Sequence, residues 1–196
     1  MMISILILMV PKTAYSAYIP VFLNALGFDN AASMMQIGVA MEVLFVFFIP
    51  FFLTRFGFKV TLMLGMISWA IRSVLFSESA LSGSYTMVII GLVLQGVCWD
   101  FFFTVADIYA DKKAGEKIKA QAQSLRFIAS NGVGLFASSV CGYIFNSHVT
   151  DTGSAGLSQW ETFWLFPAGI AVFVFIVFLF FFKDDVSHEP AKKTAE

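Results

Sequence analysis

Six ionisable side chains lie in stretches of the sequence that are otherwise apolar: Lys12, Glu42, Arg72, Asp100, Asp107 and Arg126. Three are cations and three are anions, so their charges sum to zero. A lone charge at the centre of a bilayer costs at least about 2.5 to 3.5 kcal/mol on insertion scales, so such groups normally face a bundle interior or an aqueous cavity. The pattern predicts a polar, charge-balanced site inside a membrane protein.

Spacing predicts where these charges lie in depth. Glu42 lies twelve residues from the basic end of its apolar run, Asp100 ten and Arg72 thirteen. At a rise of about 1.5 Å per residue, all three are roughly 15 to 20 Å from that end, near the bilayer midplane. We therefore expect them to share one central cavity. Asp107 and Arg126 lie nearer the basic ends of consecutive runs, which favours a pairing at an inner gate.

Glu42 and Asp100 could carry protons. Burial favours the neutral form of a carboxyl, whereas an approaching cation favours the anion, so such a group can take up a proton on one side and release it on the other. The alternative is a carboxyl kept protonated for packing. Arg72 could be a structural counter-ion or take a direct part in coupling, and both interpretations stay open.

Gln95 and Trp99 are four residues apart and form a polar and aromatic stripe on one helix face. Next to it, Asp100 and Asp107 are seven residues apart and are expected to share a face. An indole that stacks and an amide that hydrogen-bonds would suit a solute with a flat ring and hydroxyl groups. The alternative is a packed Trp beside a Gln that joins two helices.

These residues belong to long apolar runs. Hydrophobic residues make up 59% of the chain and the mean hydropathy is +0.83, whereas a soluble domain has about 45 to 50%. A helix of about 20 apolar residues crosses the hydrocarbon core, and the runs lack the alternation of membrane strands. We predict an all-α integral membrane protein with six transmembrane helices at residues 3–25, 33–54, 59–77, 85–110, 121–146 and 160–182.

Basic residues predict the orientation. Apart from the three in the apolar runs, they fall on alternate connections: Arg55, Lys59, Lys112, Lys113, Lys117, Lys119, Lys183, Lys192 and Lys193. Basic loops stay cytoplasmic, so both termini are expected in the cytoplasm. The intervening polar segments 55–58 and 111–120 are expected to be loops. Residues 1–183 would form the six-helix bundle and residues 184–196 a disordered cytoplasmic tail.

Several classes of function find no support in the sequence. The net charge of −1 gives no basic footprint for nucleic acid. Cys98 and Cys141 both lie in predicted helices, and no Cys/His cluster suggests a metal. No catalytic Ser/His/Asp set or phosphate-binding glycine loop is present, so an enzyme is not expected. No cofactor is expected other than the proton as coupling ion.

Helix breakers inside the runs could permit motion. Pro11, Pro20, Pro50 and Pro167 each remove a backbone donor and allow a kink. Residues 131–134, Asn-Gly-Val-Gly, are the most breakable point of any run. They could form the hinge of a gate helix, or simply allow close helix packing. The apolar start of the chain, with no basic flank, leads us to expect the second half of a longer protein.

Segments across most of the chain resemble one family. They are residues 48–59 (FIPFFLTRFGFK), 68–72 (SWAIR), 98–102 (CWDFF), 122–123 (AQ), 131–132 (NG) and 160–164 (WETFW). Their order and spacing resemble the second half of a nucleoside:proton symporter of the major facilitator superfamily. The resemblance implies helices seven to twelve of a twelve-helix transporter, with a missing N-terminal six-helix half as partner.

The resemblance also implies roles for particular residues. Glu42, Trp99 and Asp100 match positions of substrate binding and proton coupling, although Trp99 stands where the family usually has Phe. Thr13 and Ser16 stand where relatives have Gln and Asn, Val39 replaces a Gln, and Gln95 replaces a Tyr. The coupling carboxylates are retained, whereas several substrate-reading positions differ.

Three hypotheses follow. The first is a proton-coupled transporter that imports nucleosides across a bacterial inner membrane by alternating access, with Thr13, Ser16, Glu42, Gln95 and Trp99 binding the solute. Glu42 and Asp100 would carry the proton, and Arg72, Asp107 and Arg126 would be gating or charge partners. The second changes the cargo to a sugar or oligosaccharide. The third is a non-transporting six-helix scaffold in the lipid membrane, derived from a split gene.

Overall fold

The computed structural model describes residues 2–182, apart from the side chains of residues 114–119, 122, 125 and 126. Every regular element in this part of the chain is helical. The elements are α1 (Met2–Ala25), α2 (Ala31–Val46), α3 (Ile49–Ser82), α4 (Tyr85–Val93), α5 (Gln95–Cys98), the π-helix η1 (Trp99–Thr104), α6 (Val105–His148), the short 3-10 helix η2 (Ser154–Gly156) and α7 (Gln159–Phe181).

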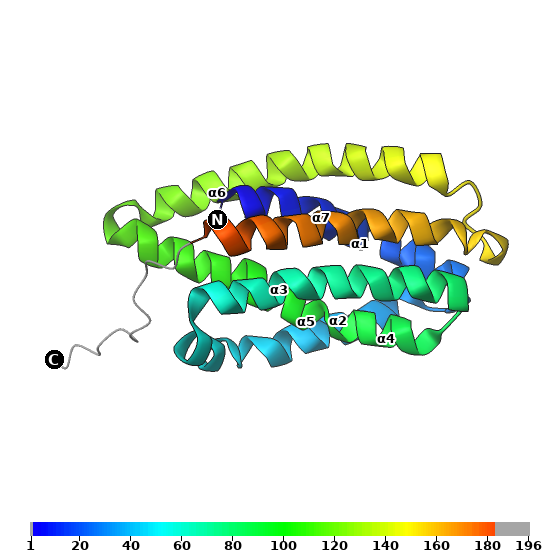
Figure 1. Cartoon of the computed structure of the whole chain (residues 1–196), viewed down its shortest axis with the longest axis horizontal. Coiled ribbons are helices and arrows are strands. Elements are labelled where there is room, and N and C mark those ends of the chain that lie inside the picture. The colour runs from blue at the N-terminus through cyan, green and yellow to red at the C-terminus, as the bar shows by residue number, and fades with distance from the viewer. Residues whose placement is uncertain (1, 183–196) are drawn as a thin grey trace.

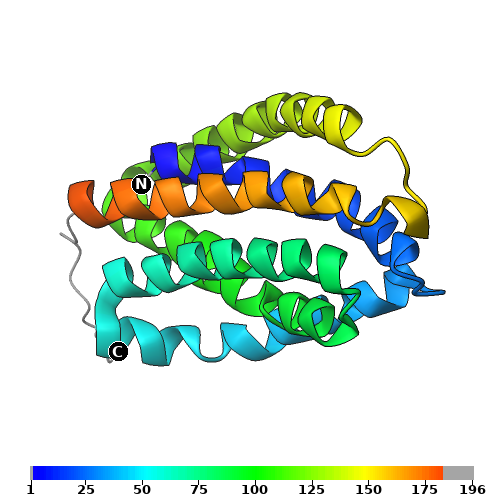
Figure 2. The same ribbon diagram turned by 45° about the vertical axis from the view of Figure 1, so that its right-hand side comes forward.

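The helices lie along one long axis (Figures 1 and 2). The turns after α1, after α3 and before α7 gather at one end of the molecule. The end of α7 and the start of α1 lie toward the opposite end (Figure 1). This alternation agrees with the predicted up-and-down order of the chain.

Five helical segments are long and apolar enough to cross a membrane: Met2–Ala25, Ile49–Ser82, Tyr85–Lys113, Phe127–His148 and Gln159–Phe181. The apolar helix Ala31–Val46 is shorter. The predicted second run, residues 33–54, is therefore divided, because α2 ends at Val46 and α3 begins at Ile49 beside Pro50. The all-helical prediction is confirmed, whereas the count of six spanning helices is not.

The predicted loop at residues 55–58 is wrong in detail, because helix α3 includes those residues. Only Gly57 leaves the helical backbone region, with φ 78° and ψ 177°. This left-handed φ strains any residue with a Cβ, so glycine permits a reversal within a single residue. Figure 1 shows the first part of α3 running to the left end and the rest returning.

The predicted loop at residues 111–120 is also helical, as part of α6. The chain nevertheless folds back there. The Gln123 amide donates to a carboxylate oxygen of Asp111, and lies 3.5 Å from the carbonyl oxygen of Asp107. Residues twelve apart on a straight helix would be roughly 18 Å apart along its axis. The reversal that the sequence predicted is present, although it is made without an extended loop.

Two other predictions concern parts of the chain beyond these reversals. Residues 131–134 lie inside α6, and the helix continues through them. The proposed disordered tail, residues 184–196, lies outside the described residues.

Aromatic side chains fill the core between α1, α3 and α7. Phe22 lies 5.2 Å from Trp160 and 5.6 Å from Trp164, measured between ring centroids. Phe76 of α3 lies 5.0 Å from Trp164 and 6.2 Å from Tyr15. Rings at such separations attract one another beyond the effect of burial alone. This packing fixes α1 against α3, which sets the position of Tyr15 and Arg72.

Helix α5 touches α2 through a glycine. A Cβ added to Gly96 would lie 2.4 Å from the carbonyl oxygen of Met41, closer than real Cβ atoms approach backbone. The neighbours of this contact are Gln95 on α5 and Glu42 on α2. The absence of a side chain at Gly96 therefore allows Gln95 and Glu42 to meet.

We expect Gly96→Ala to destabilise the protein, because the added methyl group would push α5 away from α2. Overpacking of this kind costs about 1 to 3 kcal/mol. The measurement is the apparent melting temperature of the detergent-solubilised protein. Gly169→Ala on α7 is the matched control, since a Cβ there has no neighbour within 4 Å. Equal melting temperatures for the two variants would contradict the close approach at Gly96.

Candidate functional site

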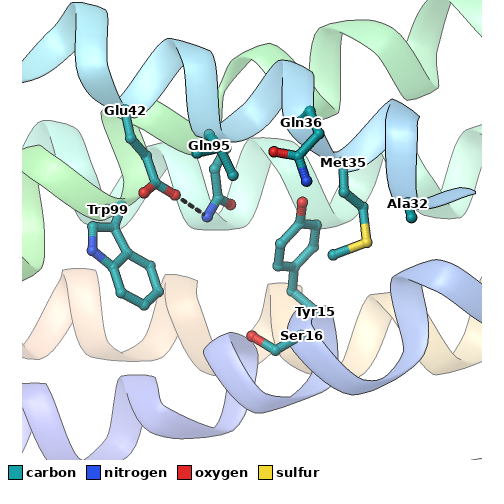
Figure 3. Close-up of a pocket in the computed structure, with 9 residues that line it drawn as sticks. Tyr15, Ser16, Ala32, Met35, Gln36, Glu42, Gln95 and Trp99 are labelled. Atoms are coloured by element: carbon teal, nitrogen blue, oxygen red, sulfur yellow. Dashed lines mark hydrogen bonds between the residues drawn. The ribbon is translucent and has the colours of Figure 1, made fainter.

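A cavity of about 440 Å³ lies between α1, α2 and the α5–η1 segment. Its walls are Tyr15, Ser16, Ala32, Met35, Gln36, Val39, Glu42, Gln95 and Trp99. Figure 3 shows Glu42 projecting from α2 toward Gln95 and Trp99, while Gln36 of the same helix points toward Tyr15 of α1. The cavity combines one carboxylate, two amides and two ring side chains. It can therefore both stack a flat ring and hydrogen-bond its polar groups.

Gln95 connects Glu42 with a buried arginine. The Gln95 side-chain nitrogen donates to Oε1 of Glu42 at 2.5 Å (Figure 3). Nη1 of Arg72 donates to the Gln95 side-chain oxygen. An arginine only donates, so the amide oxygen must face it and the amide nitrogen must face Glu42. These two hydrogen-bond partners therefore determine the orientation of the Gln95 amide.

Arg72 lies in an aromatic box. Its side chain is 1% exposed, and its guanidinium carbon lies 3.4 Å from the ring centroid of Tyr15. The rings of Trp69 and Phe76 lie 5.3 Å and 5.5 Å away. Such faces attract a cation, by about 2 kcal/mol or more where water is excluded. The rings thus compensate for part of the hydration that Arg72 loses.

Asp100 is buried but does not line the cavity. It is 4% exposed, and its Oδ1 accepts a hydrogen bond of 3.3 Å from the Thr104 hydroxyl. It belongs to η1, whose π-helical turn is wider than an α-helical turn. Asp107, by contrast, lines a second cavity. The two carboxyls that were expected on one face therefore lie in different surroundings, because the π-helix between them changes the register.

Trp99 separates two cavities. Besides the cavity described above, it lines a second one of about 190 Å³ with Lys12, Phe103 and Asp107. The Lys12 ammonium nitrogen lies 4.8 Å from the centroid of the indole ring. The nitrogen of Trp69 donates to the carbonyl of Cys98 at 3.1 Å, which holds the preceding residue against α3. The indole therefore forms part of the wall of both cavities.

The remaining predicted residues are placed as follows. Ser16 lines the first cavity, whereas Thr13 lines a third, of about 400 Å³, between α1 and α6, which Ser16 also borders. Arg72 does not line the first cavity but contacts two of its wall residues, Gln95 and Tyr15. The pairing of Asp107 with Arg126 cannot be placed, because the side chain of Arg126 lies outside the described part of the chain.

Sequence reasoning missed four wall residues: Tyr15, Ala32, Met35 and Gln36. A signal for Gln36 was present: Gln36, Val39 and Glu42 are spaced by three and lie on one helix face. Tyr15 had no such signal, since an aromatic residue in an apolar run is usually part of the core. Its role becomes visible only through its contact with Arg72.

Comparison with known proteins decides the family. The family model described as "Nucleoside H+ symporter" matches residues 1–187. The chain belongs to the nucleoside H+ symporter family. Among curated relatives, xanthosine permease of Escherichia coli (strain K12) is 30% identical over 175 residues, which are 88% of this chain and 40% of the permease. The nucleoside permease NupG of the same organism is 29% identical over 166 residues, 84% of this chain and 39% of that protein.

Solved structures agree with this placement in the symporter family. A crystal structure of a mutant of the nucleoside transporter NupG superposes with a TM-score of 0.79 at 25% identity, covering 93% of this chain and 47% of that one. The chain thus spans less than half the length of these relatives. The matched relatives are transporters rather than enzymes, and together with the apolar helices they identify a multi-pass membrane protein.

We expect Tyr15→Leu to destabilise this family member, because Arg72 would lose the ring stacked on it. A loss of about 2 kcal/mol corresponds to a fall of roughly 4 to 8 °C in melting temperature for a domain of this size. Tyr15→Phe keeps the ring and should keep most of the stability. Tyr143→Leu, at a residue 75% exposed, is the control. A Tyr15→Phe variant as unstable as Tyr15→Leu would show that the ring face is not what matters.

Proposed function

We propose that this chain is the C-terminal half of a proton-coupled nucleoside transporter that works by alternating access. The observation that carries the proposal is the cavity in which Glu42 is hydrogen-bonded to Gln95 beside the partly buried ring of Trp99. Family membership supports the cargo and the coupling ion, since the matching model is described as a nucleoside H+ symporter. The proton would be the only coupling ion, with no other cofactor.

In this proposal the nucleobase stacks on Trp99, and the sugar hydroxyls bond to Gln95, Glu42 and Gln36. Ser16 is close enough to the cavity wall to contribute, while Thr13 would contact solute on the α6 side. Glu42 takes the proton from the side to which the cavity opens. Asp100, buried behind Trp99, is the second proton-coupling carboxyl. Lys12 and Asp107 would line the path beyond the indole when it moves.

The proposed topology keeps six crossings. Helix α2 and the first part of α3, residues 49–56, together form the second crossing, because they run in the same direction (Figure 1). Residues 1–183 then form one bundle in a bacterial inner membrane, with both ends and the tail at 184–196 in the cytoplasm. Arg72, Asp107 and Arg126 would act as charge partners during gating.

A missing N-terminal six-helix half would supply the rest of the cavity wall. Exposed apolar side chains on α6 suit such a partner or lipid: Phe127, Ile128, Leu135, Phe136 and Tyr143. In the most apolar stretch of Phe127–His148, only 11% of the residues are buried within the chain. No nucleic acid partner is proposed.

A sugar or oligosaccharide is the second candidate cargo. Trp99, which lines the same cavity as Glu42, favours it, because an indole can stack on a pyranose while a carboxylate binds its hydroxyls. The first experiment compares uptake of labelled uridine, inosine and lactose in cells with the native locus intact or deleted, with and without a protonophore. The proposal expects nucleoside uptake that is lost on deletion and collapsed by the protonophore. If deletion abolished only lactose uptake, the cargo would be a sugar rather than a nucleoside. If deletion changed none of the three uptakes, the scaffold hypothesis would be favoured.

We expect Glu42→Gln to abolish accumulation of nucleoside against a gradient while sparing some exchange, because the amide keeps the shape of the site but cannot carry a proton. Labelled uptake and counterflow, measured on the same cells, separate the two activities. Glu78→Gln makes the same chemical change at an exposed position outside the cavity and should leave accumulation intact. Unchanged accumulation in Glu42→Gln would remove Glu42 from the coupling role.

A further inference from the structure

Glu42 obtains its hydrogen bond from a side chain that is itself held by a cation. No ion pair to Glu42 is found among the described side chains, and its contact is the 2.5 Å bond from Gln95. Bonds from a donor to a charged acceptor are roughly twice as strong as neutral ones. Arg72 withdraws electron density at the oxygen end of the same amide, which strengthens the N–H donor at the other end. The positive charge of Arg72 therefore reaches Glu42 through Gln95.

Gln95 is also part of the cavity wall. A solute acceptor placed in the cavity would compete with Glu42 for the amide N–H. If the solute takes that N–H, the Glu42 carboxylate loses the hydrogen-bond donor that stabilises its charge. A proton from the outer solution then becomes the replacement, and the protonated carboxyl can donate to the solute in turn. Binding of solute would favour binding of the proton, and by linkage the proton would favour the solute equally.

We propose that Gln95, anchored by Arg72, is the residue that links solute binding to proton binding at Glu42. This inference rests on the proposed function, and it assigns to Gln95 and Arg72 a positioning role beyond contact with solute. Of the other ionisable groups nearby, Tyr15 on α1 lines the same cavity as Glu42, and Asp100 on η1 is buried outside the cavity wall. Lys12 of α1 lies over the ring of Trp99. The Tyr15 ring is stacked on Arg72. The contact of Glu42 for which a solute can compete is therefore the hydrogen bond from the Gln95 amide.

The test measures how solute affinity depends on pH. Variants are introduced at the native locus, and the apparent affinity for uridine is measured by counterflow over a range of external pH. One linked proton gives up to about a tenfold change in affinity per pH unit. We expect Gln95→Met, which keeps the length of the side chain and removes both hydrogen bonds, to reduce this dependence to about twofold or less. Gln95→Leu, which also removes both hydrogen bonds and adds no ionisable group, should do the same.

Arg72 is tested through a double-mutant cycle. If Arg72 acts through Gln95, then Arg72→Gln flattens the pH dependence, and adding Gln95→Met to it changes nothing further. Arg72→Lys keeps the charge and should keep at least half of the dependence. Additive effects in the double variant would show that Arg72 reaches Glu42 by another route and would overturn the relay.

Gln36→Met is the matched control. Gln36 is an amide on the wall of the same cavity but lies outside the hydrogen-bonded chain of Arg72, Gln95 and Glu42. Loss of the Gln36 amide should weaken uridine affinity by a similar factor at every pH. The dependence of affinity on pH should therefore stay unchanged. If both Gln95 variants kept the wild-type dependence of uridine affinity on pH, the inference would be overturned, although the proposed transport function would still hold. Absence of uridine counterflow in the wild type itself would overturn the proposed function, and the inference with it.

Discussion

The interior of this bundle is organised around the buried guanidinium of Arg72, a residue that is 1% exposed. An isolated ion moved out of water costs several kcal/mol even after relaxation, so Arg72 can be kept only if neighbours replace its hydration. Three aromatic rings and the Gln95 amide replace part of that hydration, and the same Gln95 side chain donates to Glu42. One buried charge thereby fixes the relative positions of α1, α2, α3 and α5.

The same constraint explains features that are otherwise unrelated. Gly96 has no side chain because α5 must approach α2 closely enough for the amide to reach the carboxylate. Tyr15 serves both the core and the site, because its ring stacks on Arg72 and its edge borders the cavity. Trp99 follows directly after the α5 turn and divides the cavity from the one that contains Lys12 and Asp107. The site is thus a consequence of how the bundle accommodates a cation.

Helix periodicity and depth made much of this predictable from the sequence. Glu42, Arg72 and Asp100 were expected near one level, because the rise per residue depends little on context. The surroundings of Asp100 were not predictable, since a π-helical turn depends on hydrogen-bond register and leaves no trace in hydropathy. The division of the second run at Val46 and Ile49 was missed because a continuous apolar stretch conceals a short break. Tyr15 was missed because its contact crosses two helices that are distant in sequence.

The central claim is that solute and proton enter together through Glu42. The most direct test adds uridine to anaerobic, de-energised cells in weak buffer and records the external pH. The account predicts a prompt alkalinisation that is absent when the native locus carries Glu42→Gln. Uridine entry without any change of pH in cells with the wild-type gene would contradict it.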